Sequence, residues 1–191
     1  MDAGRISRGL DALARAVEAA KALEPQIAAL AGRYAEVLRG GGTLYFCGNG
    51  GSAADAQHLA TEYVVRYSTN RRPLAALALT TDSSVLTAAG NDLGFEQIFA
   101  RQVEALCGPQ DLLILHSTSG RSPNLLAAAT AARARGTRTV AFLGQHGGPL
   151  AALVDDAVLV PALETSHIQV LHLTLQHVIV ELVEAGLTGG A

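Results

Sequence analysis

Aromatic side chains and clusters of basic residues are scarce in this sequence of 191 residues. Phe, Tyr and Trp make up 4% of the chain, and Trp is absent. The chain has fourteen Lys and Arg residues and seventeen Asp and Glu residues, which gives a net charge of −3. Nucleic-acid-binding proteins need basic side chains for phosphates and often use aromatic rings for stacking on bases. The composition therefore argues against nucleic acid as a partner, and the same charge argues against an anionic membrane surface.

Cysteine and long apolar segments are also few. Cys47 and Cys107 are the only cysteines, and Cys47 lies in a predicted buried strand, so we expect reduced thiols rather than a disulfide. No run of about 18 apolar residues predicts a membrane span. The first residues, among them Asp2, Arg5 and Arg8, lack the apolar core of an export signal. These features predict a cytoplasmic protein without a membrane partner.

The remaining composition, 49% hydrophobic and 16% charged, predicts one soluble domain over residues 1–191 that buries a full core. Apolar residues recur at helical spacing over residues 6–17 and 27–38, so two amphipathic helices are expected within residues 1–41. They precede the α/β core of residues 42–191. Two extra helices with apolar stripes need a surface to cover, either the sheet or another subunit. We favour an oligomer interface.

Apolar segments alternate with helical patterns through the core. Strands are predicted at residues 43–47, 74–79, 111–116, 139–144 and 157–161, and helices at 83–89, 95–106, 124–135, 149–154 and 165–185. The unbroken apolar run 74–79 is typical of a central parallel strand. Asn91 and Asp92 are expected in a loop. The alternation predicts an α/β fold with a doubly wound, five-stranded parallel sheet.

The stretch from Thr43 to Arg66 combines a strand, a glycine loop and a helix. Glycines let the backbone approach an anion, and the free N–H groups of a helix N-terminus point at it, so this loop predicts a phosphate site. The loop residues are Asn49, Gly50, Gly51 and Ser52. The following helix carries Asp55, His58, Glu62 and Arg66, spaced so that all four are expected near one face.

A second loop of this kind follows the third predicted strand. It offers four hydroxyls within six residues, from Ser117, Thr118, Ser119 and Ser122. One such hydroxyl is typical of local helix capping, but four beside a glycine favour an anion. Because ligands of parallel sheets collect at the carboxyl ends of the strands, both loops are expected in one site.

The glycine loop also fits a relaxed dinucleotide-binding pattern, G-x-G-x-x-A over residues 48–53. That fingerprint needs an acidic residue about twenty residues further on. Asp82 lies thirty residues beyond Ser52, and a nicotinamide enzyme has no need of His58 and Glu62. We rank dinucleotide binding third among the possible functions.

His58 and Glu62 stand four residues apart, a spacing that lets two helical side chains share a metal or a proton. Such a pair on its own is usually a surface pair. The closing helix, however, is strongly apolar and carries a polar stripe: Gln169, His172, Gln176 and His177. Buried imidazoles and amides need partners. We expect the two helices to supply these partners to each other across a cleft.

Together these motifs resemble the sugar-isomerase (SIS) family, with its flavodoxin-like sheet, and within it the phosphoheptose isomerases. The resemblance covers nearly the whole chain. It is carried by CGNGGSAADAQH at 47–58, Glu62, Arg66, ALTTD at 78–82, GNDLGFEQIFARQVEAL at 90–106, STSGRSPN at 117–124, and Ile168, Gln169 and His177.

The resemblance implies an aldose–ketose isomerase that converts sedoheptulose 7-phosphate to D-glycero-D-manno-heptose 7-phosphate, early in nucleotide-activated heptose biosynthesis. It implies Glu62 and His177 as base and acid. It implies one zinc ion per subunit, bound by His58, Glu62, Gln169 and His177, and a homotetramer with sites shared between subunits. Implied substrate contacts are Asn49, Gly50, Gly51, Ser52, Glu62, Arg66, Asn91, Asp92, Ser117, Thr118, Ser119, Ser122 and Gln169.

Three positions depart from the family pattern: Val170 stands where a Glu is common, Ser166 where some members have Asp, and Arg121 where Asn is usual. A non-catalytic SIS protein that binds a phosphosugar or a replication initiator is the alternative. The initiator-binding relatives lack the family's acid and final histidine, and Glu62 and His177 are both present here. The proposed metal site also sets a geometric condition. Gln169 and His177 are eight residues apart, which is ~12 Å along a straight helix. Both can bind one metal ion only if their side chains converge, if the helix is broken, or if another subunit contributes one of them.

Overall fold

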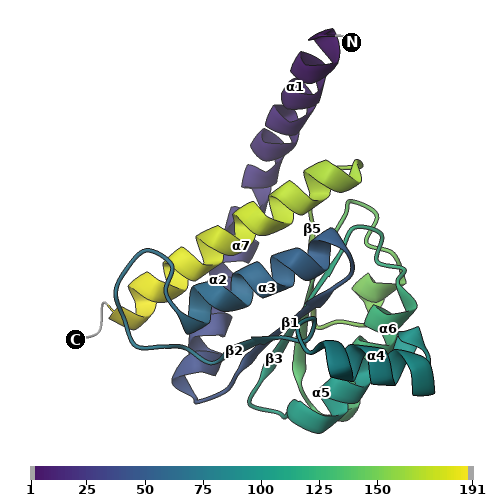
Figure 1. The fold of residues 1–191 in the computed structure, drawn as a ribbon. Coiled ribbons are helices and arrows are strands. Elements are labelled where there is room, and N and C mark those ends of the chain that lie inside the picture. Colours follow the sequence, from purple (N-terminus) through teal and green to yellow (C-terminus); the bar gives the residue numbers. More distant parts are fainter. Residues whose placement is uncertain (1–2, 189–191) are drawn as a thin grey trace.

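The computed structural model describes residues 3–188, so the first two and last three residues of the predicted domain lie outside it (Figure 1). The strands are β1 (Leu44–Gly48), β2 (Ala76–Ala78), β3 (Leu112–Ser117), β4 (Arg138–Leu143) and β5 (Asp156–Leu159). The α-helices are α1 (Ala3–Ala20), α2 (Glu24–Arg39), α3 (Gly51–Val64), α4 (Ser83–Asp92), α5 (Ala100–Leu106), α6 (Pro123–Ala134) and α7 (Thr165–Thr188). Short 3-10 turns are η1 (Lys21–Leu23), η2 (Phe95–Gln97) and η3 (Pro149–Ala152).

The five strands form one parallel sheet in the order β2-β1-β3-β4-β5, which confirms the predicted fold class. Leu44 of β1 lies between Ala76 of β2 and Leu112 of β3. The chain leaves β1 toward one edge of the sheet and then returns to the other side at β3. Ligands of such sheets bind at this point of reversal, beyond the carboxyl ends of the strands. The fold therefore directs attention to the loops after β1 and β3.

Helices cover both faces of the sheet (Figure 1). Alternate strand residues point to opposite faces, so Phe46 and Ile114 pack with α2, α3 and α7, whereas Cys47 and Leu115 pack with α5 and α6. Both cysteines are free and buried. Burial raises the pKa of the Cys47 thiol and raises that of Cys107 to about 12. No disulfide joins the two cysteines in the described part of the chain.

The two N-terminal helices differ in their packing. α2 lies along α7, but α1 extends away from the body of the molecule, with Ile6 and Leu10 more than half exposed (Figure 1). An apolar groove of about 420 Å³ lies where these helices meet α7. Its apolar lining residues are Val17, Ala20, Ile27, Ala28, Leu171, Leu175, Val178 and Leu182.

Three predictions of local structure were wrong. The run 74–79 yields only the short β2, at the edge of the sheet, because an apolar pattern does not show which strands will pair. Asn91 and Asp92 belong to the last turn of α4, which continues past Gly90. The predicted helix 95–106 is divided into η2 and α5.

Within the described residues 3–188, one segment, Thr165–Leu187 of α7, is long and apolar enough to cross a membrane by length and composition alone, although it is not an unbroken apolar run. In the fold it packs against α2 and α3, and three of its polar side chains, His172, Gln176 and Glu184, are buried inside the protein. The mostly buried core helix of a soluble protein passes the same test of length and composition. The α7 helix is such a core helix.

Candidate functional site

The glycine loop connects the end of β1 at Gly48 with the start of α3 at Gly51. Gly50 has φ 58° and ψ −119°, a backbone conformation that side chains with a Cβ rarely adopt. This turn brings the N-terminus of α3 over the end of the sheet, with Ser52 buried in its first turn. The loop thus places the start of a helix at the end of the sheet, the arrangement on which the predicted phosphate site depends.

The second loop follows β3 and leads into α6. Ser122 precedes the helix, but its side chain makes no capping hydrogen bond, so local capping does not account for this hydroxyl. The hydroxyls of Ser117 and Ser119 accept hydrogen bonds from loop N–H groups, those of Gly120 and Arg121. A polar pocket of about 310 Å³ opens beside the loop, lined by Thr118, Ser119, Arg121, Gln145, His146 and Thr165, among others.

The two loops are joined by a reciprocal pair of amides. Asn49 donates to Asn124 Oδ1 at 2.9 Å, and Asn124 donates to Asn49 Oδ1 at 2.8 Å. Asn124 is buried in the first turn of α6, so it holds the glycine loop against that helix. Two hydroxyl-bearing or glycine-rich loops therefore meet where the strand order reverses.

His58, Glu62 and His177 form the second part of the site. Their ligand atoms all lie within 4.8 Å of one another. His58 Nε2 is 3.0 Å from His177 Nε2 and 3.2 Å from Glu62 Oε1. Burial and the neighbouring His58 lower the pKa of His177, while Glu62 opposes the shift. The expected meeting of α3 and α7 through these side chains is confirmed.

The donor atoms fit a divalent metal ion. Two ligands bound tetrahedrally to zinc at about 2.0–2.1 Å are about 3.3 Å apart, close to the separations observed here. Two imidazoles and a carboxylate without thiolate suit zinc and also admit other divalent ions. Three protein ligands from one subunit leave a coordination position for a further group, either a side chain from another subunit or the substrate.

Gln169, the fourth expected ligand, lies at the other end of the contact between the helices. A Cβ atom added to Gly51 would clash with Gln169 Nε2, so this amide sits against the glycine loop. α3 and α7 run side by side in the same direction, with Gly51 opposite Gln169 and His58 opposite His177 (Figure 1). α7 continues through Thr188 as one helix, so within one subunit Gln169 stands eight residues, ~12 Å, from His177 of the cluster.

The expected polar stripe on α7 does not face α3 as a unit. Gln176 lies 3.2 Å from His116 Nε2 of β3 and donates to the Tyr34 hydroxyl of α2 at 3.3 Å. The His172 ring lies against His116, with ring centres 5.9 Å apart. Consecutive helical residues differ by about 100° in direction, so Gln176 and His177 point to different neighbours. His172 and Gln176 belong to the core.

Arg66, Asn91 and Asp92 do not join the cluster within this subunit. α3 ends at Val64, so the prediction that Arg66 continues the helical face is wrong, and its side chain is exposed. Asn91 donates to the Asp92 carboxylate at 2.7 Å, and both side chains are exposed. Asp55 remains on α3, where burial raises the pKa of its carboxyl group and His58 opposes that shift.

Sequence reasoning missed Tyr67, which is adjacent to Arg66. Its ring stacks on the His177 ring, with centres 5.5 Å apart and planes inclined by 24°. Neither its position nor its spacing marks it in the sequence, because it lies beyond the end of α3. Asn124 was also missed, although a buried amide at a helix start next to a serine loop is a usable signal.

The buried histidines of the core predict acid sensitivity. Burial, together with His172, lowers the pKa of His116 to about 3, and burial lowers that of His172 to about 4. In the folded protein both pKa values lie below 6.5, the ordinary pKa of histidine. The contribution of the two histidines to the free energy of unfolding is therefore fully present above pH 6.5 and is lost as the pH falls. From pH 7.5 to 5.5 the two should cost about 3 kcal/mol of unfolding free energy. Urea unfolding at both pH values measures this.

In that experiment His172→Leu should remove about half of the pH dependence, because only His116 would still titrate. Replacing the exposed His146 with Gln is the matched control and should leave the dependence as in the parent. Equal pH dependence in the parent and His172→Leu would show that His172 does not contribute.

The chain is similar to known proteins over both the fold and the candidate site. A model of the SIS domain matches residues 10–144. The phosphoheptose isomerase of Solidesulfovibrio magneticus is 56% identical over 150 residues, which are 78% of this chain and 73% of that protein.

Two solved structures share nearly the whole fold. The phosphoheptose isomerase GmhA from Neisseria gonorrhoeae has a TM-score of 0.89 at 38% identity, covering 95% of this chain and 98% of that one. The phosphoheptose isomerase from Francisella tularensis has a TM-score of 0.90 at 36% identity, covering 96% and 98%. These similarities extend through the N-terminal helices and the closing helix.

Proposed function

The chain belongs to the SIS-domain family of phosphoheptose isomerases, and on that basis we propose that it interconverts sedoheptulose 7-phosphate and D-glycero-D-manno-heptose 7-phosphate. This reaction is an aldose–ketose isomerisation, early in nucleotide-activated heptose biosynthesis. The observation that carries the proposal is the cluster of His58, Glu62 and His177, which lies further along α3 from two loops that hydrogen-bond to each other.

The loops would hold the phosphate end of the sugar. The N-terminus of α3 presents the N–H groups of Gly50 and Gly51, and Ser52 and the second loop offer hydroxyls. We assign the phosphate and nearby hydroxyls to Ser52, Ser117, Thr118, Ser119 and Ser122. Asn49, Gln169 and Arg66 would contact the remainder of the substrate, and Asn91 and Asp92 would do so from a neighbouring subunit.

Glu62 and His177 would move the proton. Isomerisation transfers a proton between adjacent carbons through an enediol, which requires a base at the carbon and a donor at the oxygen. The Glu62 carboxylate is half-buried and faces the two imidazoles, so it suits the base. His177 suits the donor when its Nε2, which lies in the same cluster, carries a proton; an Nε2 bound to a metal would have none to donate, so the two roles of this atom alternate.

We propose that His58, Glu62 and His177 hold one zinc ion per subunit, with Gln169 completing the site from another subunit. When bound, zinc would supply a Lewis acid that polarises the substrate carbonyl. The supporting observation is the set of donor separations of 3.0 and 3.2 Å.

We also propose a cytoplasmic homotetramer. Its interfaces would use residues 1–41 together with the apolar groove on α7, since α1 leaves apolar side chains exposed. Light scattering should give a mass of four subunits. Leu10→Glu on α1 should lower that mass, whereas Arg5→Glu, on the same helix, should not. A fully active monomer would contradict the shared site.

Turnover of sedoheptulose 7-phosphate tests the proposed reaction, with arabinose 5-phosphate and fructose 6-phosphate as competing substrates. The alternative is a non-catalytic phosphosugar-binding or initiator-binding SIS protein. That alternative predicts sugar-phosphate binding with no turnover in metal-loaded protein. The presence of both Glu62 and His177 in one cluster favours the enzyme.

A further inference from the structure

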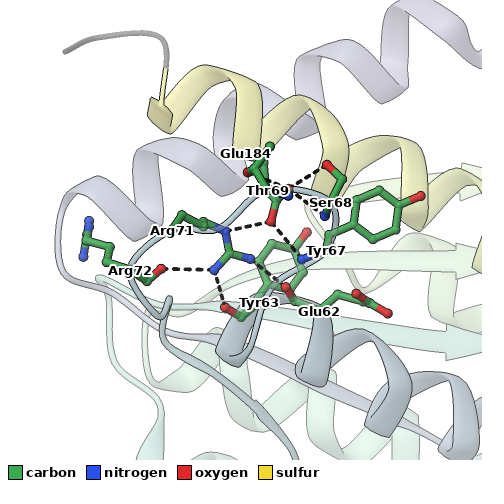
Figure 2. Close-up of polar contacts among 8 residues, drawn as sticks. All are labelled: Glu62, Tyr63, Tyr67, Ser68, Thr69, Arg71, Arg72 and Glu184. Carbon is green, nitrogen blue, oxygen red and sulfur yellow. Dashed lines mark hydrogen bonds and ion pairs between the residues drawn. The ribbon is translucent and has the colours of Figure 1, made fainter.

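Glu184 of α7 is a buried carboxylate that holds the loop following α3 (Figure 2). It accepts hydrogen bonds from the backbone N–H groups of Tyr67, Ser68 and Thr69 at 2.9, 3.0 and 3.1 Å. The hydroxyls of Ser68 and Thr69 donate to it as well, at 3.0 and 3.1 Å. One side chain of α7 therefore fixes three consecutive residues of this loop.

Arg71 ties the same carboxylate to the end of α3. Its Nε lies 2.9 Å from Glu184 Oε1, and both side chains are almost fully buried. Its remaining nitrogens donate to the carbonyls of Glu62 at 2.6 Å and Tyr63 at 2.8 Å. A helix leaves its last carbonyls without partners, and the guanidinium satisfies two of them here. Figure 2 shows the carboxylate and the guanidinium between the loop and the two helices.

The carboxylate is charged in this environment. Burial acts to raise the pKa of Glu184, but hydrogen bonds from the N–H groups of Tyr67, Ser68 and Thr69 and from the Ser68 hydroxyl outweigh it and lower the pKa to about 2. A buried, charged and fully hydrogen-bonded pair has few alternative arrangements. The loop is thus held in one conformation.

The loop conformation determines what lies against His177. Tyr67 is the first residue fixed by Glu184, and its ring stacks on one face of the His177 imidazole. The His58 ring meets His177 edge-on, with centres 5.2 Å apart. His177 is therefore confined between two rings while its Nε2 points at His58 Nε2.

We propose that Glu184 and Arg71 are positioning residues: they hold Tyr67 against His177 and so fix the His177 ring for proton transfer. Tyr67 is then a further residue of the site, acting through its ring face. The catalytic part of this inference rests on the proposed function. The positional part, that Glu184 determines the stacking of Tyr67 on His177, does not.

Glu184→Gln tests the proposal, because it keeps the shape but removes the charge that pairs with Arg71. We expect kcat to fall about tenfold or more with KM little changed, since the serine loops are untouched. The matched control is Asp156→Asn, which breaks the Arg33–Asp156 pair between α2 and β5, far from the cluster. It should lower stability without lowering kcat.

A spectroscopic measurement tests the positional part without turnover. A ring stacked on an imidazole displaces the NMR signals of its C–H groups, so the ¹H–¹³C signals of His177 in metal-free protein report the stacking. They can be assigned by their loss in His177→Gln. Tyr67→Leu should move these signals, Tyr67→Phe should not, and Glu184→Gln should move them in the direction of Tyr67→Leu.

Unchanged His177 signals in Glu184→Gln would overturn the proposal, and so would an equal loss of kcat in Glu184→Gln and Asp156→Asn. If Glu184→Gln does not fold, Tyr67→Leu decides: full kcat would overturn the role of Tyr67, and a kcat restored by Tyr67→Phe would support it. If the parent protein has no isomerase activity, the proposed function fails, and the His177 signals still decide whether Glu184 sets the stacking.

Discussion

Glu62→Gln is expected to lower turnover of sedoheptulose 7-phosphate by about 10² or more while sugar-phosphate binding remains. The amide keeps the shape of the side chain but cannot accept the proton from carbon. Glu62 lies ten residues along α3 from Ser52, ~15 Å by helical rise. A seven-carbon phosphosugar is somewhat shorter, but it is long enough to place its carbonyl end near Glu62 while its phosphate stays in the loops, because the side chains at both ends reach toward it.

Two further variants serve as a control and a contrast for Glu62→Gln. Glu104→Gln removes an exposed carboxylate of α5 that pairs with Arg101, and it should leave turnover unchanged. Ser119→Ala should have the opposite signature from Glu62→Gln, with weaker binding and a smaller effect on kcat. Because Glu62 is also a proposed metal ligand, metal content must be measured in each preparation. Near-normal turnover of metal-loaded Glu62→Gln would show that Glu62 is not the base.

His58→Ala is expected to lower zinc affinity by about 100-fold or more, because loss of even a residue that only supports a ligand costs 10–100-fold. His58 contributes the nitrogen that is close to both Glu62 and His177. Competition with a chromophoric chelator measures the affinity, and elemental analysis should give one zinc per subunit in the parent. Complete chelation should abolish turnover, and added zinc should restore it.

His167→Ala is the matched control for the metal experiment. His167 also lies near a carboxylate, 3.7 Å from Glu164, but on α7 outside the cluster. Its replacement should leave zinc affinity unchanged. Equal affinity in His58→Ala and the parent, or full activity after verified metal removal, would contradict the proposed zinc site.

The parts of the site that sequence predicted best are those with a local cause. The glycine loop and the start of α3 follow from glycines after an apolar strand, a pattern confined to about ten residues. His58 and Glu62 follow from the period of the helix. The parallel sheet follows from alternating strands and helices, because a crossover helix makes neighbouring strands parallel.

The parts that sequence missed depend on contacts between distant residues. The direction of His172 and Gln176 depends on His116 and Tyr34, which lie on other elements. The hydrogen bond between Tyr67 and Glu184 joins residues far apart in the chain, and no local pattern marks either side chain. The edge position of β2 depends on which strands pair, and its apolar sequence carries no information about that choice.

The placement of the two cysteines has a consequence for how the protein responds to oxidants. Thiolates are the reactive form of cysteine, and burial keeps both thiols protonated and out of reach. The cluster uses only nitrogen and oxygen donors, so no step in the proposed chemistry depends on sulfur. Hydrogen peroxide or an alkylating reagent at concentrations that inactivate thiol-dependent enzymes should therefore leave this isomerase working, and heptose synthesis could continue during oxidative stress.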